Sequence, residues 1–92
     1  MRIIGDIPHP NLKITVFKMD NRLSVKFESG FNEQTFKFRT SSELQNFKDV
    51  ERLVDADFLE NVEATFTKMA AAKNEVIQRF YPRMREEFEE II

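Results

Sequence analysis

Apolar residues recur every three or four positions along the C-terminal part of the chain. This spacing places them on one face of an α-helix, which has about 3.6 residues per turn. The positions are Phe58, Val62, Phe66, Met69, Val76, Phe80, Met84, Phe88 and Ile91. They keep their phase across Pro82, a residue that costs about 3 kcal/mol inside a helix. The pattern therefore predicts a long C-terminal helix that is kinked or broken near Pro82.

Three earlier segments alternate between apolar and polar residues, which is the two-residue period of a strand with one buried face. Their apolar positions are Leu12, Ile14 and Val16, then Leu23, Val25 and Phe27, and then Phe36 and Phe38. Asp20-Asn21 separates the first two segments and favours a two-residue hairpin turn. That turn pairs Val16 with Val25. It also pairs Ile14 with Phe27 on the same face, as a regular hairpin register requires.

Two further segments complete the expected sheet. Isoleucines in residues 3–7 favour a short edge strand at the start of the chain. Residues 29–32 favour a second turn, and residues 34–39 a further strand. We expect Phe36 of that strand to lie opposite Phe27. The result is an antiparallel meander of three or four strands.

A short helix is expected between residues 42 and 55. The spacing of Ser42 and Gln45 fits a capping box at its start. The spacing of Asn46 and Asp49 fits a rival start slightly later. Two aspartates are candidate caps of the long helix that follows, Asp55 and Asp57.

These elements predict an α+β fold, in which a short helix and the long C-terminal helix cover one face of the antiparallel meander. We expect a single domain over residues 1–92, with the sheet in residues 1–40 and the helices in residues 41–92. The sheet is expected to cover the helical stripe as far as about Phe80. Beyond Pro82, either the chain folds back or a second molecule covers the remaining apolar residues.

The composition indicates a globular chain and excludes some kinds of site. Hydrophobic residues make up 41% of the sequence and charged residues 33%, as is typical of a folded domain. There is no cysteine, so disulfides and thiolate metal sites are excluded. The sequence shows neither the apolar core of a signal peptide nor a run of about 18 apolar residues. We therefore expect a cytoplasmic location.

The net charge of −2 hides a difference between the two halves of the chain. Residues 1–40 carry seven Lys and Arg against four Asp and Glu, and residues 41–92 carry seven against twelve. The sheet half is therefore mildly basic, and the helical half is acidic.

No motif points to catalysis, a cofactor or a metal. The only histidine, His9, lies between two prolines with no ligand pattern nearby, so we expect a solvated loop residue. Ser41 and Ser42 have no histidine near them in sequence to activate them, and two glycines are too few for a phosphate-binding loop. A dense group of carboxylates favours a solvated acidic face: Glu86, Glu87, Glu89 and Glu90. We therefore expect no enzyme activity.

The polar face of the expected sheet is a candidate nucleic-acid face. Its basic and aromatic residues are Lys13, Phe17, Lys26, Lys37 and Arg39. Basic side chains bind phosphates, and aromatic side chains stack on bases. In the expected register Lys26 lies beside Lys37. Against this function stand the acidic composition of the chain and the ordinary occurrence of lysine on solvated sheet faces.

Apolar residues at two places favour self-association. Two lie on the polar face of the sheet, and four lie beyond Pro82. The candidate set is Phe17, Met19, Met84, Phe88, Ile91 and Ile92. We expect a non-enzymatic protein-interaction module that forms a homodimer through its C-terminal helix. Nucleic-acid binding by the sheet is the alternative.

Three runs of the sequence, IGDIPHPNLKITVF, FNEQTFKF and VERLVDADFLENV, resemble a small family of uncharacterised single-domain proteins of Bacteroidetes-type bacteria. The resemblance covers residues 3–66 and implies no catalytic residue. A strand meander followed by a helix is also similar to the PUR-type nucleic-acid-binding repeat. This chain differs from that repeat in its acidic helices and its single unit, so the similarity concerns architecture alone.

Overall fold

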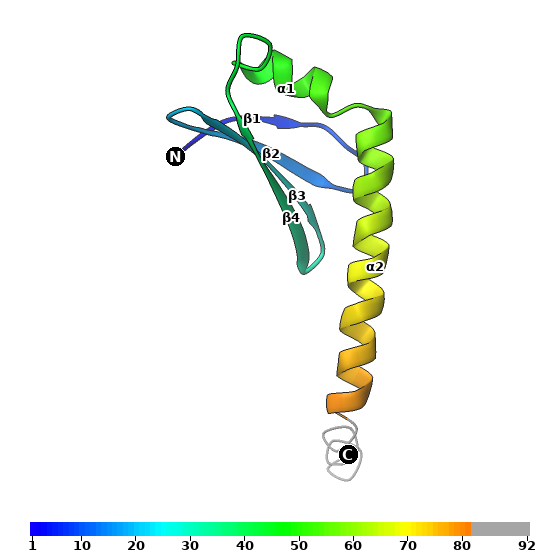
Figure 1. Ribbon diagram of the computed structural model, residues 1–92. Helices are drawn as coiled ribbons and strands as arrows, with labels where there is room; N and C mark the ends of the chain where they lie inside the picture. The colour runs from blue at the N-terminus through cyan, green and yellow to red at the C-terminus, as the bar shows by residue number, and fades with distance from the viewer. Residues whose placement is uncertain (82–92) are drawn as a thin grey trace.

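The structure, a computed structural model, describes residues 1–81. A four-stranded antiparallel sheet in the order β1-β2-β3-β4 is followed by two helices (Figure 1). The elements are β1 (Arg2–Ile7), β2 (Lys13–Met19), β3 (Arg22–Ser29), β4 (Asn32–Arg39), α1 (Phe47–Leu53) and α2 (Ala56–Phe80). The predicted α+β meander with a short and a long helix is confirmed. The bend expected at Pro82 lies outside the described residues.

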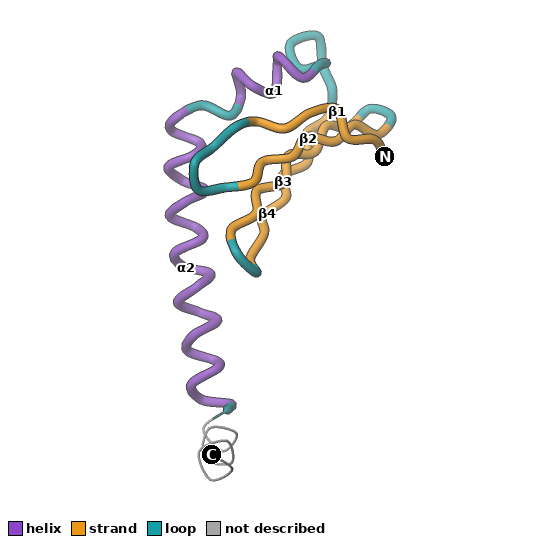
Figure 2. Tube along the Cα trace, turned by 180° about the vertical axis from the view of Figure 1, so that it is seen from behind, coloured by secondary structure: helices purple, strands orange, loops and turns teal. Residues whose placement is uncertain are grey.

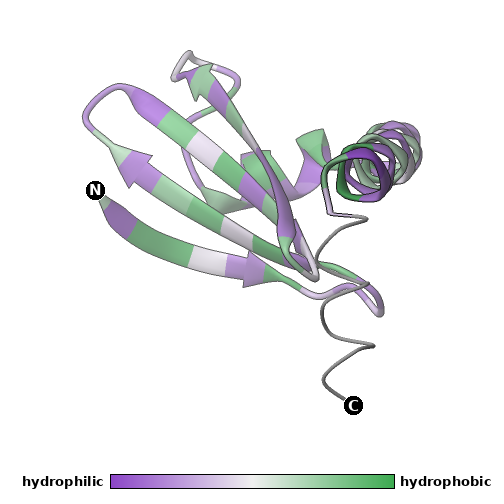
Figure 3. Cartoon of the chain, turned by 90° about the horizontal axis from the view of Figure 1, so that it is seen from below, coloured by the Kyte–Doolittle hydropathy of each residue, from purple (hydrophilic) through white to green (hydrophobic). Residues whose placement is uncertain are grey.

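The β2–β3 hairpin forms with the predicted register. Asp20 has a φ of 51° in the turn, a conformation that Asp tolerates better than most residues. Val16 pairs with Val25. Ile14 pairs with Phe27, and all four side chains are buried. Apolar and polar residues alternate as bands along the strands in Figure 3, so the turn and the alternation favour the same register.

The register between β3 and β4 differs from the prediction by two residues. The strands are joined by a two-residue turn at Gly30-Phe31, whose first residue has a φ of +60°. Because this turn is tighter than expected, β4 begins at Asn32. Phe36 consequently pairs with Val25 and not with Phe27. A shift of two residues leaves every side chain on its predicted face and changes only its neighbours.

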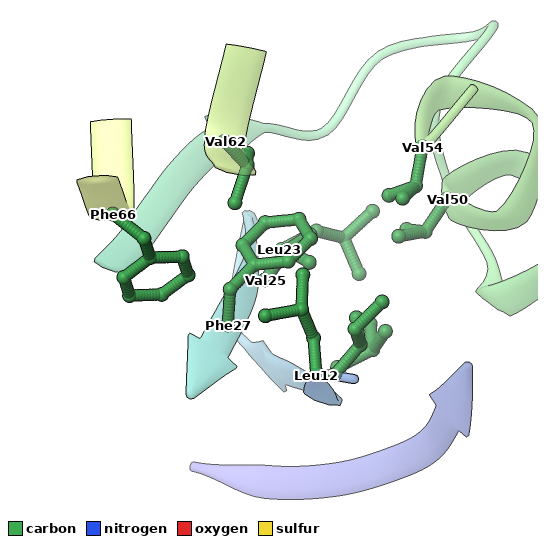
Figure 4. Close-up of a cluster of buried hydrophobic side chains, with 10 residues drawn as sticks. Leu12, Leu23, Val25, Phe27, Val50, Val54, Val62 and Phe66 are labelled. Atoms are coloured by element: carbon green, nitrogen blue, oxygen red, sulfur yellow. The ribbon is translucent and has the colours of Figure 1, made fainter. Parts of the chain in front are cut away.

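The hydrophobic core lies between one sheet face, which we call the inner face, and the two helices (Figure 4). Its buried members are Leu12, Ile14, Val16, Leu23, Val25, Phe27, Val50, Val54, Val62 and Phe66. Burying each side chain of this kind contributes about 1.5–3 kcal/mol. The rings of Phe27, Phe36 and Phe58 pack edge to face, with centroids 5.0 to 5.8 Å apart. This aromatic cluster joins β3 and β4 to the first turn of α2.

α1 approaches β1 closely because position 5 is glycine. A bulge between Ile3 and Gly5 interrupts the pairing of β1 with β2. A Cβ atom on Gly5 would lie 2.3 Å from the Phe47 ring, far inside van der Waals contact. The missing side chain at Gly5 therefore makes room for the first residue of α1.

α1 begins at the later of its two predicted starts. The Asn46 side chain accepts a hydrogen bond from the backbone N–H of Asp49. In return, the Asp49 carboxylate accepts bonds from the backbone N–H groups of Gln45 and Asn46. This capping box replaces the one expected at Ser42. The two backbone N–H groups, followed by the Arg52 guanidinium, hold the pKa of Asp49 below its ordinary value of 3.8.

α2 begins after Asp55, one of the two predicted caps. The Asp55 carboxylate accepts a hydrogen bond of 2.9 Å from the backbone N–H of Phe58. Further along, Nε2 of Gln34 in β4 donates a 2.9 Å bond to the carbonyl oxygen of Val62. This bond fixes the position of α2 along β4 in addition to the apolar contacts.

The cap predicts a pH-dependent contribution of Asp49 to stability. Because folding lowers the pKa of this carboxyl, its contribution is present above pH 3.8 and is lost as the pH falls below that value. We expect Asp49→Asn to lower the free energy of unfolding at pH 7 and to have little effect at pH 2. Urea unfolding followed by circular dichroism at both pH values measures this difference. A cost that persists unchanged at pH 2 would contradict the role of the charge.

Candidate interaction surfaces

α2 continues past the β3–β4 turn, away from the sheet (Figures 1 and 2). Its apolar residues from Phe58 to Met69 pack against the core, whereas Val76 is 45% exposed and Phe80 is 77% exposed. The prediction that the sheet covers the stripe to about Phe80 is therefore wrong. The cover ends near Met69 because the sheet ends at the β3–β4 turn.

We call residues 70–80 of α2 the overhang. One face of the overhang continues the face by which α2 packs on the sheet, because Val76 and Phe80 follow Met69 at helical spacing. The Phe80 ring contacts the Tyr81 ring edge to face, with centroids 5.5 Å apart. Lys73 is the charged residue on this face, and its aliphatic stem can lie along apolar neighbours. Residues 1–81 therefore provide no cover for this apolar stripe.

Another exposed aromatic residue lies close to the start of the overhang. Phe31, in the β3–β4 turn, is 100% exposed. Ser29, just before the turn, lines a shallow hollow with Phe66, Thr67 and Ala70 of α2. The turn and the first residues of the overhang are therefore neighbours, and both present apolar side chains to solvent.

The structure places two of the six predicted self-association residues. Phe17 and Met19 lie on the sheet face that the helices leave uncovered, as predicted. Met19 is 45% exposed, and Phe17 is half-buried. The remaining four lie outside the described residues: Met84, Phe88, Ile91 and Ile92.

We call the sheet face opposite the helices the outer face, and its charges are separated along the strands. Glu28 and Glu33 pair with each other near the β3–β4 turn. Arg22 and Arg39 pair with each other at the far end of the same strands, which we call the basic end. Lys37 belongs to the basic end because it lies two residues before Arg39 on the same face. The outer face is therefore basic at one end, whereas the end near the β3–β4 turn has mixed charge, because Lys13 pairs with Glu28 and Lys26 lies beside it.

Lys26, near the middle of the outer face, already has partners within the protein. Its Nζ lies 2.9 Å from the Glu28 carboxylate and 5.7 Å from the centroid of the Phe17 ring. The hydrogen bond and the charge of Glu28 raise the pKa of Lys26, and Lys26 lowers the pKa of Glu28. Lys26 pairs with Thr35. The prediction that it lies beside Lys37 is wrong because of the altered β3–β4 register.

The basic end holds like charges that have no partner of opposite charge in residues 1–81. Arg22 lies directly opposite Arg39, and such cross-strand pairs of like charge are unfavourable. Within the described residues, no carboxylate lies within 4 Å of Arg22, Lys37 or Arg39. The nucleic-acid face predicted from the sequence does not include Arg22. The alternation of β3 would have placed Arg22 on this face, because it lies two residues before Ser24. The basic end is thus the part of the outer face that is open to an anionic partner.

His9 holds the β1–β2 loop against α2, so the prediction of a solvated residue is wrong. Its side chain is only 13% exposed. Nδ1 accepts hydrogen bonds of 3.0 and 3.1 Å from the backbone N–H groups of Asn11 and Leu12. In the neutral ring the proton is then on Nε2, which lies 3.4 Å from the Glu63 carboxylate. His9 therefore has a structural role between loop and helix.

The described residues show no arrangement that is typical of catalysis. No group of three or more His, Cys, Asp or Glu in residues 1–81 could hold a metal ion. An open hollow beside α1 is lined in part by Asp49 and Arg52, which already serve the start of α1. The carboxylates from Glu86 to Glu90 lie outside the described residues. Nor does this part of the chain contain a helix that is long and apolar enough to cross a membrane.

Comparison with known proteins adds no functional information. No protein-family model, curated protein or solved structure matches the chain significantly. The resemblances to the bacterial family and to the PUR-type repeat stay predictions. Any proposal about function must therefore be based on the overhang and the outer face.

The Lys26–Glu28 pair predicts a measurable coupling on the outer face. We expect Glu28→Gln to lower the pKa of Lys26 towards its ordinary value of 10.5, because Glu28 is the main cause of the increase. Glu33→Gln is the matched control and should cause a smaller change, since Glu33 contributes least to the increase. NMR titration of the Lys26 side chain measures both effects. Equal changes in the two variants would contradict the pairing.

Proposed function

We propose that the protein is a non-enzymatic interaction module that self-associates through the C-terminal part of α2. The observation that carries this proposal is the overhang, whose apolar stripe continues the core-facing side of α2 beyond the sheet. Exposed apolar surface of this kind is stabilised by contact with another surface, at about 25 cal/mol per Å² removed from water. A chain of 92 residues buries a modest core, so dimerisation also adds stability.

A second copy is the partner that the overhang fits best. Two overhangs that pair in opposite directions about a two-fold axis bring identical apolar stripes together. Phe80 of one copy then lies beside Ala70 of the other, where a small side chain leaves room for the ring. Phe31 of that other copy lies nearby in its β3–β4 turn and can contact the end of the same helix. This arrangement covers most of the large apolar side chains that are exposed elsewhere than on the outer face: Phe31, Val76, Phe80 and Tyr81.

The dimer is expected to depend on the apolar side of the overhang. Val76→Glu/Phe80→Glu places two charges in the proposed contact, and we expect the dissociation constant to rise at least about tenfold, since burying unpaired charges is costly. Asn74→Glu/Gln78→Glu adds the same two charges on the opposite side of the helix and should leave association unchanged. Sedimentation equilibrium of the intact chain at tens of micromolar measures both. A monomeric wild-type chain, or equal effects of the two variants, would argue against the proposal.

Nucleic-acid binding by the outer face is the second candidate, favoured by the unpaired cations of the basic end. Arg22, Lys37 and Arg39 present positive charge without a carboxylate nearby in residues 1–81, as phosphate contacts require. The face carries a single aromatic side chain, Phe17, and Lys26 partly covers its ring. Glu28 and Glu33 on the same face repel phosphates. Self-association is therefore the better-supported function.

Titration with a single-stranded oligonucleotide at low salt distinguishes the two candidates. If the basic end binds phosphates, Lys37→Glu/Arg39→Glu should abolish a salt-dependent affinity that the wild type shows. Lys13→Glu/Lys26→Glu is the matched control on the same face but outside the basic end, and it should have a smaller effect. Weak binding that is identical in all three proteins would exclude this function.

The proposal involves no cofactor, metal or small-molecule substrate. It retains the cytoplasmic location expected from the sequence. Fractionation of the native host tests that location directly.

A further inference from the structure

β4 forms one edge of the sheet, and its outward side has no neighbouring strand in residues 1–81. It is the last strand in the order β1-β2-β3-β4 (Figure 1). Its eight residues pair with β3 without a bulge or a shift of register. A regular edge strand of this kind presents a row of free N–H and C=O groups to any other strand that approaches.

The alternation of backbone hydrogen bonds decides which residues of β4 face this edge. Ser29 and Asn32 close the two-residue turn, so their pair is hydrogen-bonded, and so is every second pair after it. The even-numbered residues of β4 therefore bond to β3. The odd-numbered residues direct their backbone groups to the edge: Glu33, Thr35, Lys37 and Arg39. Within the described residues, no other hydrogen bond reaches these backbone groups.

The helices leave the β4 edge open. α2 packs on β4 through side chains of the inner face. Gln34 donates its hydrogen bond to α2, and the Phe36 ring lies 5.0 Å from the Phe58 ring. These side chains project out of the plane of the sheet, whereas the free backbone groups lie in that plane. The opposite edge differs, because β1 carries a bulge and the Phe47 ring of α1 packs on Gly5.

We propose that β4 pairs antiparallel with β4 of a second copy, about a two-fold axis at Thr35. This contact goes beyond the self-association proposed above, because it uses a different part of the molecule. Glu33 of each copy then lies opposite Lys37 of the other, and the two Thr35 residues lie opposite each other. These three pairs form about six backbone hydrogen bonds, two for each pair. The two sheets become one continuous sheet with both inner faces on the same side.

The charges of β4 favour a second copy as the occupant of the edge. Glu33 lies opposite Glu28 in the sheet, and Glu28 is already bound to Lys26. Lys37 lies opposite the uncharged Ser24. Within residues 1–81, neither Glu33 nor Lys37 has an ion-pair partner within 4 Å. The proposed register supplies each of them with the opposite charge, twice in each dimer.

The other registers near the centre of β4 fit less well. An axis at Glu33 or at Lys37 brings two copies of the same charge opposite each other. An axis at Gln34 places neither charge opposite its complement. An axis at Phe36 places Glu33 opposite Arg39 but leaves Lys37 opposite Thr35. The axis at Thr35 therefore pairs both charges.

Charged edge strands also protect proteins against unwanted pairing. In β4 the two charges nearest the centre have opposite sign and lie at equal distances from Thr35. Charges of a single sign would repel in every antiparallel self-pairing, whereas this arrangement attracts in the register proposed here. The order of the charges therefore favours pairing of β4 with itself.

Charge exchange tests the register in the full chain carrying Val76→Glu/Phe80→Glu, which removes the overhang contact. That chain should still dimerise through β4. Adding Glu33→Lys or Lys37→Glu makes both ion pairs repulsive, and each should raise the dissociation constant about tenfold. Adding Glu33→Lys/Lys37→Glu together restores opposite charges and should recover the affinity. Sedimentation equilibrium measures the four samples. Glu60→Lys/Lys68→Glu is the matched control, an exchange at exposed positions of α2 that should change nothing.

A backbone substitution tests the hydrogen bonds of the edge. Thr35→Pro removes the N–H group that bonds across the axis, and an edge strand tolerates proline where the N–H faces away from the sheet. We expect a folded chain that no longer pairs through β4. Thr35→Val keeps the N–H group and should pair as before. Thermal unfolding of each variant checks that the fold is intact.

The outcomes separate this contact from the proposed function. In the wild type both contacts act, so the average mass should exceed that of a dimer. A wild-type dimer that Val76→Glu/Phe80→Glu makes monomeric would overturn the β4 contact and leave the proposed function intact. A dimer that resists this variant but is dissociated by Thr35→Pro would do the reverse. A monomeric wild-type chain would overturn both. A loss of affinity in Glu33→Lys that the double exchange does not recover would also overturn the β4 contact.

Discussion

The structure depends on the packing of one apolar helix face against one apolar sheet face of limited length. The inner face of β2 and β3 is fully buried, and α2 covers it with side chains from Phe58 to Met69. The other elements complete this packing. α1 fills the remaining space beside β1, and the Gln34 side chain donates a hydrogen bond to the backbone of α2. Where the sheet ends, the helix face keeps its phase but loses its cover. The property that stabilises the fold therefore also creates the exposed stripe of the overhang.

The outer face follows from the same alternation. Because the inner face takes the apolar positions, nearly all the charged residues of the strands point outward. The β3–β4 register then decides their neighbours: it places Glu28 opposite Glu33 and Arg22 opposite Arg39. Pairs of like charge weaken an isolated sheet, and the Arg22–Arg39 pair makes one end of the outer face basic. Lys26 differs from the cations of the basic end because it has partners within the protein, the Glu28 carboxylate and the Phe17 ring.

The sequence predicted which residues lie on the outer face better than it predicted which of them are neighbours. Alternation correctly assigned Lys13, Phe17 and Lys37 to the outer face, and Arg22 was available from the same rule. The sequence could not predict which cations have a partner of opposite charge. That depends on the cross-strand neighbours, and an error of two residues in the β3–β4 register replaces every one of them. The role of His9 was also beyond the sequence. Its partner Glu63 is distant in the chain, and the two meet only after α2 has packed on the sheet.

The sequence by itself determined the elements whose signals are local. The alternation, the turn at Asp20 and the helical stripe of α2 each lie within a few neighbouring residues, and each predicted its element and its buried side. Only the tertiary structure decided where the stripe loses its cover near Met69, because that point depends on where the β3–β4 turn lies relative to α2. It also decided which charges of the outer face have partners. Both outcomes arise from distances between segments that are far apart in the chain, which a local pattern of residues does not contain.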